Sequence, residues 1–245
     1  LGGLRLLGYT RDVSGSNADV TLYWQARDRV PKRYTSFVHL LGPDQTLKAQ
    51  FDRSPYDDHR PTDEMQLGDV VPFFARLPIP VGGPFRLEAG LYDDPRVGHL
   101  QRADGGDVLP LGLVDTRPLP SGLSVDFDNG ARLVGARLER EGGRLLVTLA
   151  WRATRRIERT YTVFVHVVGP DGRIVAQGDG PPELGTRGTP EWPRGETILD
   201  PHSVELGVNG GPLRVLVGLY RPGDGVRARA GGGQDRVDLG QVPAP

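Results

Sequence analysis

Apolar and polar residues alternate in short runs along the whole chain. In the run 144–153, Leu145, Val147, Leu149 and Trp151 fall on one side of an extended backbone, and the residues between them fall on the other. A period of two is that of a β-strand with one buried face. No long run keeps the helical spacing of apolar residues free of Gly or Pro. The pattern therefore predicts an all-β chain.

The alternating runs predict about seven strands in each half of the chain. In the first half the expected strands are 4–9, 18–26, 34–41, 46–52, 69–76, 85–92 and 107–114. In the second half they are 131–138, 144–153, 161–168, 173–179, 196–206, 212–220 and 235–242. Turn-forming residues separate the strands, as in Gly42–Gln45 and Gly169–Gly172. Short strands in this number, with turns between them, are typical of a β-sandwich of immunoglobulin-like size.

The second half of the sequence repeats the first. Tyr34–Gln45 returns as Tyr161–Gly172, 127 positions later. The same offset relates Val20–Trp24 to Val147–Trp151, and a Gly-Leu-Tyr triplet recurs at an offset of 128. A repeat of this length is a whole domain and not one unit of a solenoid.

The repeat divides the 245 residues into two domains, 1–117 and 118–245. Each is near the commonest size of a domain and is large enough to bury its own core. Between them, Arg117–Gly122 contains two prolines, which predict a short and semi-rigid connector. We therefore expect two tandem immunoglobulin-like β-sandwich domains.

Composition narrows the classes of partner. The 30 Lys and Arg residues balance 31 Asp and Glu residues, which argues against a nucleic-acid-binding protein. Cys is absent, so neither a disulfide nor a thiolate metal site can form. No apolar run is long enough for a transmembrane helix, so we expect no membrane insertion by this segment. The chain opens directly in a predicted strand, as a fragment of a longer protein or a matured form would.

Two tryptophans are expected in the cores of the sandwiches. Trp24 and Trp151 occupy equivalent positions of the repeat, on the apolar side of their strands. A central Trp on an inward face is a feature of immunoglobulin-like sandwiches. The alternation therefore predicts that both rings are buried, with ligand stacking as the less favoured role.

The pair Phe37 and His39 recurs as Phe164 and His166. Alternation puts Phe and His of each pair on one face of a strand and apolar residues such as Val165 on the other, which predicts an outer-face position for both pairs. One interpretation is a platform on which a sugar ring stacks or to which a ligand hydrogen-bonds. The other is a pair covered by a neighbouring strand or loop, with the His bonded to the backbone.

Asp52 and Asp179 also recur, each after Ala-Gln and one further residue. An Asp at a strand end commonly accepts hydrogen bonds from backbone N–H groups of a loop. A Ca²⁺ site is the alternative, with Asp57 and Asp58 beside Asp52 in the first half. The second half has only Glu183 near Asp179, so this cluster is not repeated.

Signatures of catalysis and of cofactor binding are missing. The sequence has no nucleophile elbow, no P-loop and no dinucleotide fingerprint. His59, His99 and His202 stand singly, without the spacing of metal ligands. We therefore expect no catalytic residue, no bound metal and no cofactor, and a chain that is not itself an enzyme. An enzyme is the least favoured alternative, since sequence spacing does not determine whether two carboxylates meet as a glycosidase pair.

Trp192 lies in a turn-rich loop between prolines, where the first half has Met65. Such a Trp can face solvent and stack on a sugar. It can equally close the end of the sandwich. The exchange for Met indicates that the two halves are not equal in any binding by this loop.

Together these motifs resemble a β-sandwich module of Chloroflexi-type bacteria, the tandem C-terminal portion of family 39 (protein mannosyltransferase-like) membrane glycosyltransferases. The residues that carry the resemblance are Leu7–Tyr9, Val20–Ala26, Tyr34–Leu41, Tyr161–Val168, Val175–Pro182, Trp192–Glu196 and Gly218–Tyr220. They span nearly the whole chain, and the first half departs from the pattern at Gln45, Ser54 and Met65. The resemblance assigns no catalytic residue to this chain.

The resemblance implies that catalysis belongs to a membrane portion of the parent protein and that these domains are extracytoplasmic or at the cell surface. We therefore expect a non-catalytic module whose partner is a glycan or that membrane portion. The alternative is a structural or assembly module of the cell envelope or of an extracellular filament. Charged side chains expected along a sheet edge disfavour assembly through strand pairing: Arg132, Arg137, Arg140 and Arg144.

Overall fold

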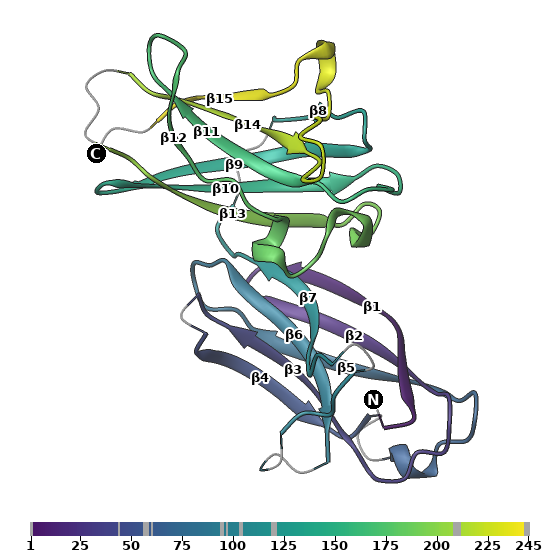
Figure 1. Cartoon of the computed structure of the whole chain (residues 1–245). Coiled ribbons are helices and arrows are strands. Elements are labelled where there is room, and N and C mark those ends of the chain that lie inside the picture. The colour runs from purple at the N-terminus through teal and green to yellow at the C-terminus, as the bar shows by residue number, and fades with distance from the viewer. Residues whose placement is uncertain are drawn as a thin grey trace. The chain divides into compact units, whose positions relative to one another are not determined.

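The structure is a computed structural model that describes residues 2–43, 45–55, 59, 61–93, 96, 98–102, 105–118, 122–207 and 212–242. Antiparallel β-strands form nearly all of its regular structure, and the only helical elements described are short 3₁₀ turns (Figure 1). The prediction of an all-β fold of sandwiches is confirmed. The candidate calcium ligands Asp57 and Asp58, and residues 119–121 of the connector, lie outside the described residues.

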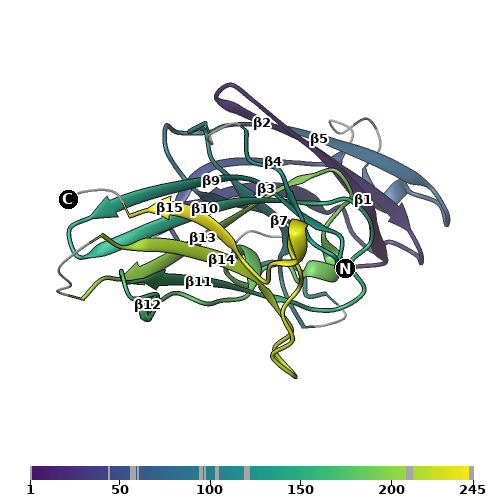
Figure 2. The ribbon, with the colours of Figure 1, turned by 90° about the horizontal axis from the view of Figure 1, so that it is seen from above.

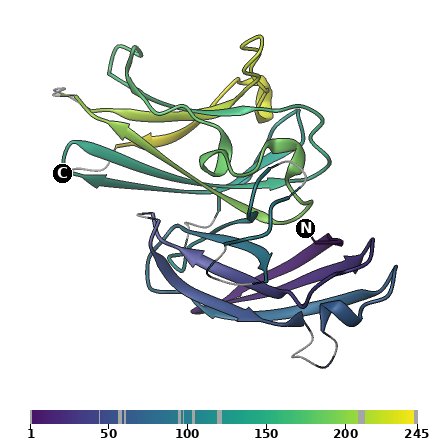
Figure 3. The ribbon, with the colours of Figure 1, turned by 60° about the horizontal axis from the view of Figure 1, so that its bottom comes forward.

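The chain forms two compact units, Leu1–Arg117 and Pro118–Pro245. In the first, whose strands are coloured from purple to teal in Figure 3, one sheet has the strand order β1-β2-β5 and the other β4-β3-β6-β7. These strands are β1 (Leu4–Ser14), β2 (Asn17–Ala26), β3 (Thr35–Leu41), β4 (Leu47–Arg53), β5 (Val70–Pro78), β6 (Phe85–Tyr92) and β7 (Leu109–Val114), with the 3₁₀ turn η2 (Thr62–Glu64) before β5. Apolar side chains from both sheets form one core cluster.

The second unit repeats this plan with sheets ordered β13-β10-β9-β8 and β12-β11-β14-β15; the latter strands run side by side in Figure 2. The strands are β8 (Val125–Asp126), β9 (Ala131–Glu141), β10 (Arg144–Ala153), β11 (Thr162–Val168), β12 (Ile174–Gln177), β13 (Thr197–Glu205), β14 (Arg214–Tyr220) and β15 (Val237–Gln241). The 3₁₀ turns are η3 (Pro182–Gly185), η4 (Thr189–Glu191) and η5 (Gly231–Gly233). The two-residue strand β8 was not expected from the sequence.

Alternation explains which side chains enter each core. Trp24 and Trp151 are 0% exposed, so the prediction that both are core residues is confirmed. Each indole nitrogen has a partner: Trp24 Nε1 donates to Ser36 Oγ at 3.0 Å, and Trp151 Nε1 donates to Asp200 Oδ2 at 3.1 Å. The two copies thus satisfy the same buried donor with different acceptors.

One expectation about sheet edges is wrong. Arg144 lies on β10, which pairs with β9 on one side and with β13 on the other, so it guards no edge. Its guanidinium instead contacts Glu205 on β13, with 2.7 Å between Nε and Oε1. The other three arginines lie on β9, where Arg132 pairs with Asp126 of the short strand β8.

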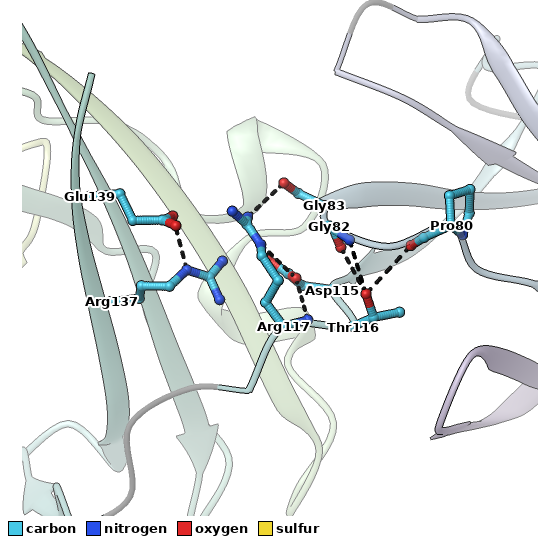
Figure 4. A network of polar contacts seen from close by, with 8 residues as sticks. All are labelled: Pro80, Gly82, Gly83, Asp115, Thr116, Arg117, Arg137 and Glu139. Carbon is cyan, nitrogen blue, oxygen red and sulfur yellow. Dashed lines mark hydrogen bonds and ion pairs between the residues drawn. The ribbon is translucent and has the colours of Figure 1, made fainter. Parts of the chain in front are cut away.

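The end of the first unit is held by its own polar side chains (Figure 4). The Asp115 carboxylate, with its side chain 1% exposed, accepts from Arg117 Nη2 at 2.9 Å, and the same nitrogen donates to the Gly83 carbonyl at 2.7 Å. Thr116 Oγ1 accepts from the Gly82 N–H at 3.0 Å. The chain therefore leaves the first unit from a segment that is fixed to it.

Candidate functional site

The Phe and His pairs lie on the outer faces of β3 and β11, away from the cores. Their neighbours Val38 and Val165 belong to the two core clusters, whereas Phe37 and Phe164 do not. Each Phe ring instead lies over a glycine of the adjacent strand. A Cβ on Gly90 would come within 2.5 Å of the Phe37 ring, and the same holds for Gly218 and Phe164. The repeated Gly-Leu-Tyr triplet therefore supplies a bare backbone for the ring.

A side chain from a later loop covers each ring. The His99 ring lies 4.2 Å from that of Phe37, measured between centroids, and the Arg227 guanidinium lies 4.3 Å above the Phe164 centroid. Phe37 is 0% exposed and Phe164 1%. Neither ring offers an open face to a sugar, so the structure shows the covered pair and not the open platform.

The two histidines bind the recurring aspartates. His39 Nε2 lies 3.1 Å from Asp52 Oδ1, and His166 Nε2 lies 3.5 Å from Asp179 Oδ1. Each histidine thus contacts the recurring carboxylate, whereas the second interpretation expected a backbone partner. Asp179 Oδ1 also accepts the Val165 N–H at 3.2 Å, so its backbone partner lies within β11, whereas the sequence predicted a partner in a loop.

The His166 imidazole is neutral near pH 7. Burial lowers its pKa and the charge of Arg227 lowers it further, while Asp179 and Asp235 oppose this only in part. A neutral imidazole has one N–H donor and one acceptor nitrogen. Beside a ligand, His166 therefore adds polarity without adding charge.

His166 lines a groove of about 490 Å³ on the outer face of the β12-β11-β14-β15 sheet. Strand register places its floor in rows: Val168 pairs with Arg214, and His166 pairs with Leu216, which in turn pairs with Asp238. Ile174 on β12 extends the first row. We call this the outer groove. Its volume is in the range of small-molecule sites, and its floor combines apolar and polar side chains.

Guanidinium–carboxylate pairs form the polar walls of the outer groove. Arg214 Nη2 lies 2.5 Å from Asp238 Oδ2. Arg227 and Arg236 share Asp235, with Nη1–oxygen distances of 3.0 Å and 3.1 Å. In the outer groove, Arg214 and Asp238 thus present N–H donors next to a carboxylate acceptor, and Arg227 and Arg236 add further N–H donors. This arrangement can hydrogen-bond a ligand rich in hydroxyl groups.

The first unit has different side chains at the equivalent positions. Counted by the repeat, Leu216 corresponds to Glu88 and Arg227 to His99. Glu88 is only 7% exposed, and its Oε2 lies 3.3 Å from Arg86 Nη2. A carboxylate thus occupies the place where the outer groove has an apolar floor, so the two copies differ in their outer-face chemistry.

A second polar cluster lies inside the second unit, on the inward face of β13. Asp200 Oδ1 accepts the Glu183 N–H at 3.1 Å, and Oδ2 accepts from Trp151 Nε1 at 3.1 Å and lies 2.9 Å from His202 Nε2. The other ring nitrogen, His202 Nδ1, lies 2.9 Å from the Gly178 carbonyl. Since both ring nitrogens face acceptors, the doubly protonated imidazolium satisfies both contacts.

The pKa of His202 is raised, which also favours the protonated imidazolium. Burial acts to lower it, but the charge and hydrogen bond of Asp200, together with the Gly178 carbonyl, outweigh burial and raise the pKa. His202 borders a hollow of about 260 Å³ that the segment 178–181 also lines. The cluster therefore fastens this segment to β13.

An arginine holds two of the acids in the 178–196 segment. Glu183, 0% exposed, is bound by Arg187, whose Nε lies 2.6 Å from Oε2, and Arg187 also contacts Glu196 at 3.2 Å. Among the described residues there is no group of three or more His, Asp or Glu side chains that could hold a metal ion. In the same residues, no helix is long and apolar enough to cross a membrane.

Trp192 lies in the core of the second unit. It is 5% exposed, and its ring centroid lies 6.3 Å from that of Trp151. Of the two roles expected for this loop residue, the structure shows the one in which Trp192 closes the end of the sandwich. Within the part of the chain that the structure describes, its indole nitrogen has no hydrogen-bond partner.

The residues of the outer groove that sequence reasoning missed are Arg214, Leu216, Arg227, Arg236 and Asp238. Arginine is frequent throughout the chain, so none of these stood out by type. One signal was present: at position 227 the repeat exchanges His for Arg, and at position 216 it exchanges Glu for Leu. Differences between two copies of one fold mark the places where the copies can differ in function.

No protein-family model and no curated protein matches the sequence. Several solved structures are similar to it at low TM-score. A glycosyl hydrolase family 2 member from Bacteroides cellulosilyticus has a TM-score of 0.31 and 10% identity, over 92% of this chain and 27% of that chain. A β-glucuronidase from glycoside hydrolase family 2 has a TM-score of 0.30 and 11% identity, over 89% of this chain and 24% of that chain. The exo-chitosanase of Amycolatopsis orientalis has a TM-score of 0.28 and 12% identity, over 94% of this chain and 26% of that chain.

The chain thus spans about a quarter of the length of these structures. At these TM-scores the likeness carries no argument about function.

Proposed function

We propose that the chain is a non-catalytic, extracytoplasmic pair of β-sandwiches that binds a glycan in the outer groove of the second unit. In this proposal it is an accessory region of a membrane glycosyltransferase, as the resemblance of its motifs implies. The chain holds the glycan, and the chemistry belongs to the membrane portion of the parent protein.

The outer groove carries the proposal. Its floor has apolar side chains, Leu216 among them, between guanidinium–carboxylate pairs such as Arg214 with Asp238. A sugar ring has apolar C–H faces and a rim of hydroxyl groups, each of which can donate and accept a hydrogen bond. An apolar floor between fixed donors and acceptors complements both features.

A glycan panel followed by titration tests the proposal. Amide NMR spectra of the full chain are recorded with neutral gluco-, manno- and galacto-oligosaccharides, and we expect shifts confined to β11, β12, β14, β15 and the loops that adjoin them around the outer groove. Leu216→Glu introduces the residue of the first unit and should weaken binding at least about tenfold, because it buries a carboxylate under the ligand. Leu67→Glu makes the same change at a side chain that is 77% exposed in the first unit, and should leave binding unchanged.

Two results would contradict the proposal. One is the absence of shifts with every glycan of the panel. The other is binding that Leu216→Glu leaves intact, since the ligand would then occupy a different surface.

A specific observation favours the assembly alternative as the second candidate. On the outer face of the β1-β2-β5 sheet, Phe74 is 64% exposed, Val70 45% and Tyr23 37%. Exposed apolar side chains that gather on one face are typical of surfaces that bind another protein. Concentration-dependent sedimentation of the full chain, abolished by Phe74→Ser, together with a failure to bind glycans, would favour this role.

A further inference from the structure

A second hollow adjoins the outer groove. It measures about 570 Å³, and Asp128, Val226, Arg229, Gln234 and Asp235 line it. Arg227 lines both spaces. We call this second space the side hollow.

Arg227 is fixed where the two spaces meet. Its guanidinium lies 4.3 Å above the Phe164 ring, and its Nη1 lies 3.0 Å from Asp235 Oδ2. Phe164 in turn rests on Gly218, which has no room for a Cβ. A ligand that occupies both spaces must therefore pass over a guanidinium that cannot easily turn aside.

The charges of the two spaces nearly cancel. Four arginines and three aspartates line them, which leaves a formal charge of +1: Arg214, Arg227, Arg229, Arg236, Asp128, Asp235 and Asp238. All three carboxylates are engaged. Asp235 contacts two guanidiniums, Asp238 contacts Arg214, and Asp128 accepts the backbone N–H of Arg229 at 3.0 Å.

This pairing disfavours an anionic ligand. A uronate or phosphate group bound to Arg214, Arg227 or Arg236 would lie beside the carboxylate that this guanidinium already contacts, and the two negative charges would repel each other. A hydroxyl group accepts from the guanidinium and donates to the carboxylate without breaking the pair. His166 adds no charge, because its lowered pKa keeps it neutral near pH 7.

We infer that the outer groove and the side hollow are consecutive subsites for an extended, uncharged oligosaccharide that lies across Arg227. This inference rests on the proposed function and adds the chemical class and the extent of the ligand. Arg227 contacts the ligand in both subsites, whereas Arg229 contacts it only in the side hollow.

Position 227 offers a variant that the fold already tolerates. The equivalent residue in the first unit is His99, whose ring covers Phe37 at 4.2 Å. Arg227→His should therefore keep Phe164 covered while it removes the guanidinium common to both subsites. Arg229→Gln changes the side hollow alone and does not touch Phe164.

Calorimetric titration of the full chain tests the inference. The ligands are neutral oligosaccharides of the best-binding type, from one to six sugar units, and oligogalacturonides of the same lengths. We expect the affinity for the neutral series to rise at least about tenfold between one and four units and then to level off. It should change less than about threefold between roughly 50 and 500 mM salt, since no net charge is neutralised on binding.

The variants separate the subsites. Arg227→His should weaken binding of all chain lengths, and Arg229→Gln should weaken only the longer chains. A neutral affinity that is equal for one and six units would overturn the extended site. Tighter and salt-sensitive binding of oligogalacturonides would overturn the uncharged ligand. Both results leave the proposed glycan-binding function standing, whereas no binding of any oligosaccharide would overturn that function as well.

Discussion

Asp200 is the residue whose removal should damage the second unit most. It is 0% exposed and accepts or faces three N–H groups: Trp151 Nε1, the Glu183 amide and His202 Nε2. Asp200→Ala removes the acceptor for all three and leaves a buried imidazolium without its counterion. Removing one partner of a buried ion pair costs about 3–5 kcal/mol. We expect the free energy of unfolding of the second unit to fall by this amount, and not by the sum over three bonds, because His202 can release its proton and water can enter.

Urea unfolding followed by NMR measures this loss in the intact chain. The indole N–H signals of Trp24 and Trp151 report the two units separately, because each tryptophan is buried in its own core cluster. The Trp151 signal should disappear at lower urea in Asp200→Ala, whereas the Trp24 signal should keep the midpoint of the unmodified chain. A change within about 0.5 kcal/mol, the range of an ordinary surface substitution, would refute the reasoning.

The same cluster predicts how stability depends on pH. The pKa of His202 is raised in the folded state, so the stabilisation from its proton is fully present below the unfolded pKa, about 6.5. It is lost as the pH rises through the folded pKa. The free energy of unfolding of the second unit should therefore decrease above about pH 6.5, and His202→Gln should abolish this decrease. An equal decrease in both proteins would show that another group titrates.

The first unit supplies a control for the size of the effect. At the positions equivalent to Asp200, His202 and Val163 it has Phe73, Ala75 and Ser36. The triple variant Asp200→Phe, His202→Ala and Val163→Ser therefore gives the second unit the residues of the first. Replacing a buried ion pair by well-packed apolar residues is often neutral or stabilising. We expect the triple variant to be more stable than Asp200→Ala and to lack the decrease in stability above about pH 6.5.

Two further changes test the packing around the site. Gly218→Ala should destabilise the second unit by about 1–3 kcal/mol, because the new Cβ would lie 2.5 Å from the Phe164 ring, whereas Gly223→Ala, with open space around it, should be neutral in the same urea titration. Trp192→Ala should cost about 3–5 kcal/mol through the cavity it leaves beside Trp151, yet change the glycan affinity of the folded protein less than about threefold. Selective loss of binding with unchanged stability would instead place Trp192 in the ligand site.

Local pattern predicted the strands and the faces of their side chains. The period of two located the burial of Trp24 and Trp151, and it put Phe37 and Phe164 on outer faces. It could not show that both rings are covered, because the covering residues lie more than sixty positions later in the chain, at His99 and Arg227. Alternation reports the side of a strand to which a residue points, and it does not report what a distant loop brings there.

Other parts of the site depend on pairing between strands. The outer groove joins Leu216 to Asp238 across β14 and β15, and a bulge in that pair shifts the register by one residue. Such a shift is invisible to a simple count of alternate positions. The sequence held more information about the Asp200–His202 cluster. At inward positions of β13 these two polar residues replace Phe73 and Ala75 of the first copy.

In each copy a Phe ring packs on a glycine of the neighbouring strand, and the side chain that covers the ring differs between the copies. The His99 imidazole covers the ring in the first copy, and the Arg227 guanidinium covers it in the second. Because the fold is duplicated, the covering residue can change in one copy while the other copy keeps its own. A protein engineer could draw on the same property, changing the recognition chemistry at one position without repacking either interior.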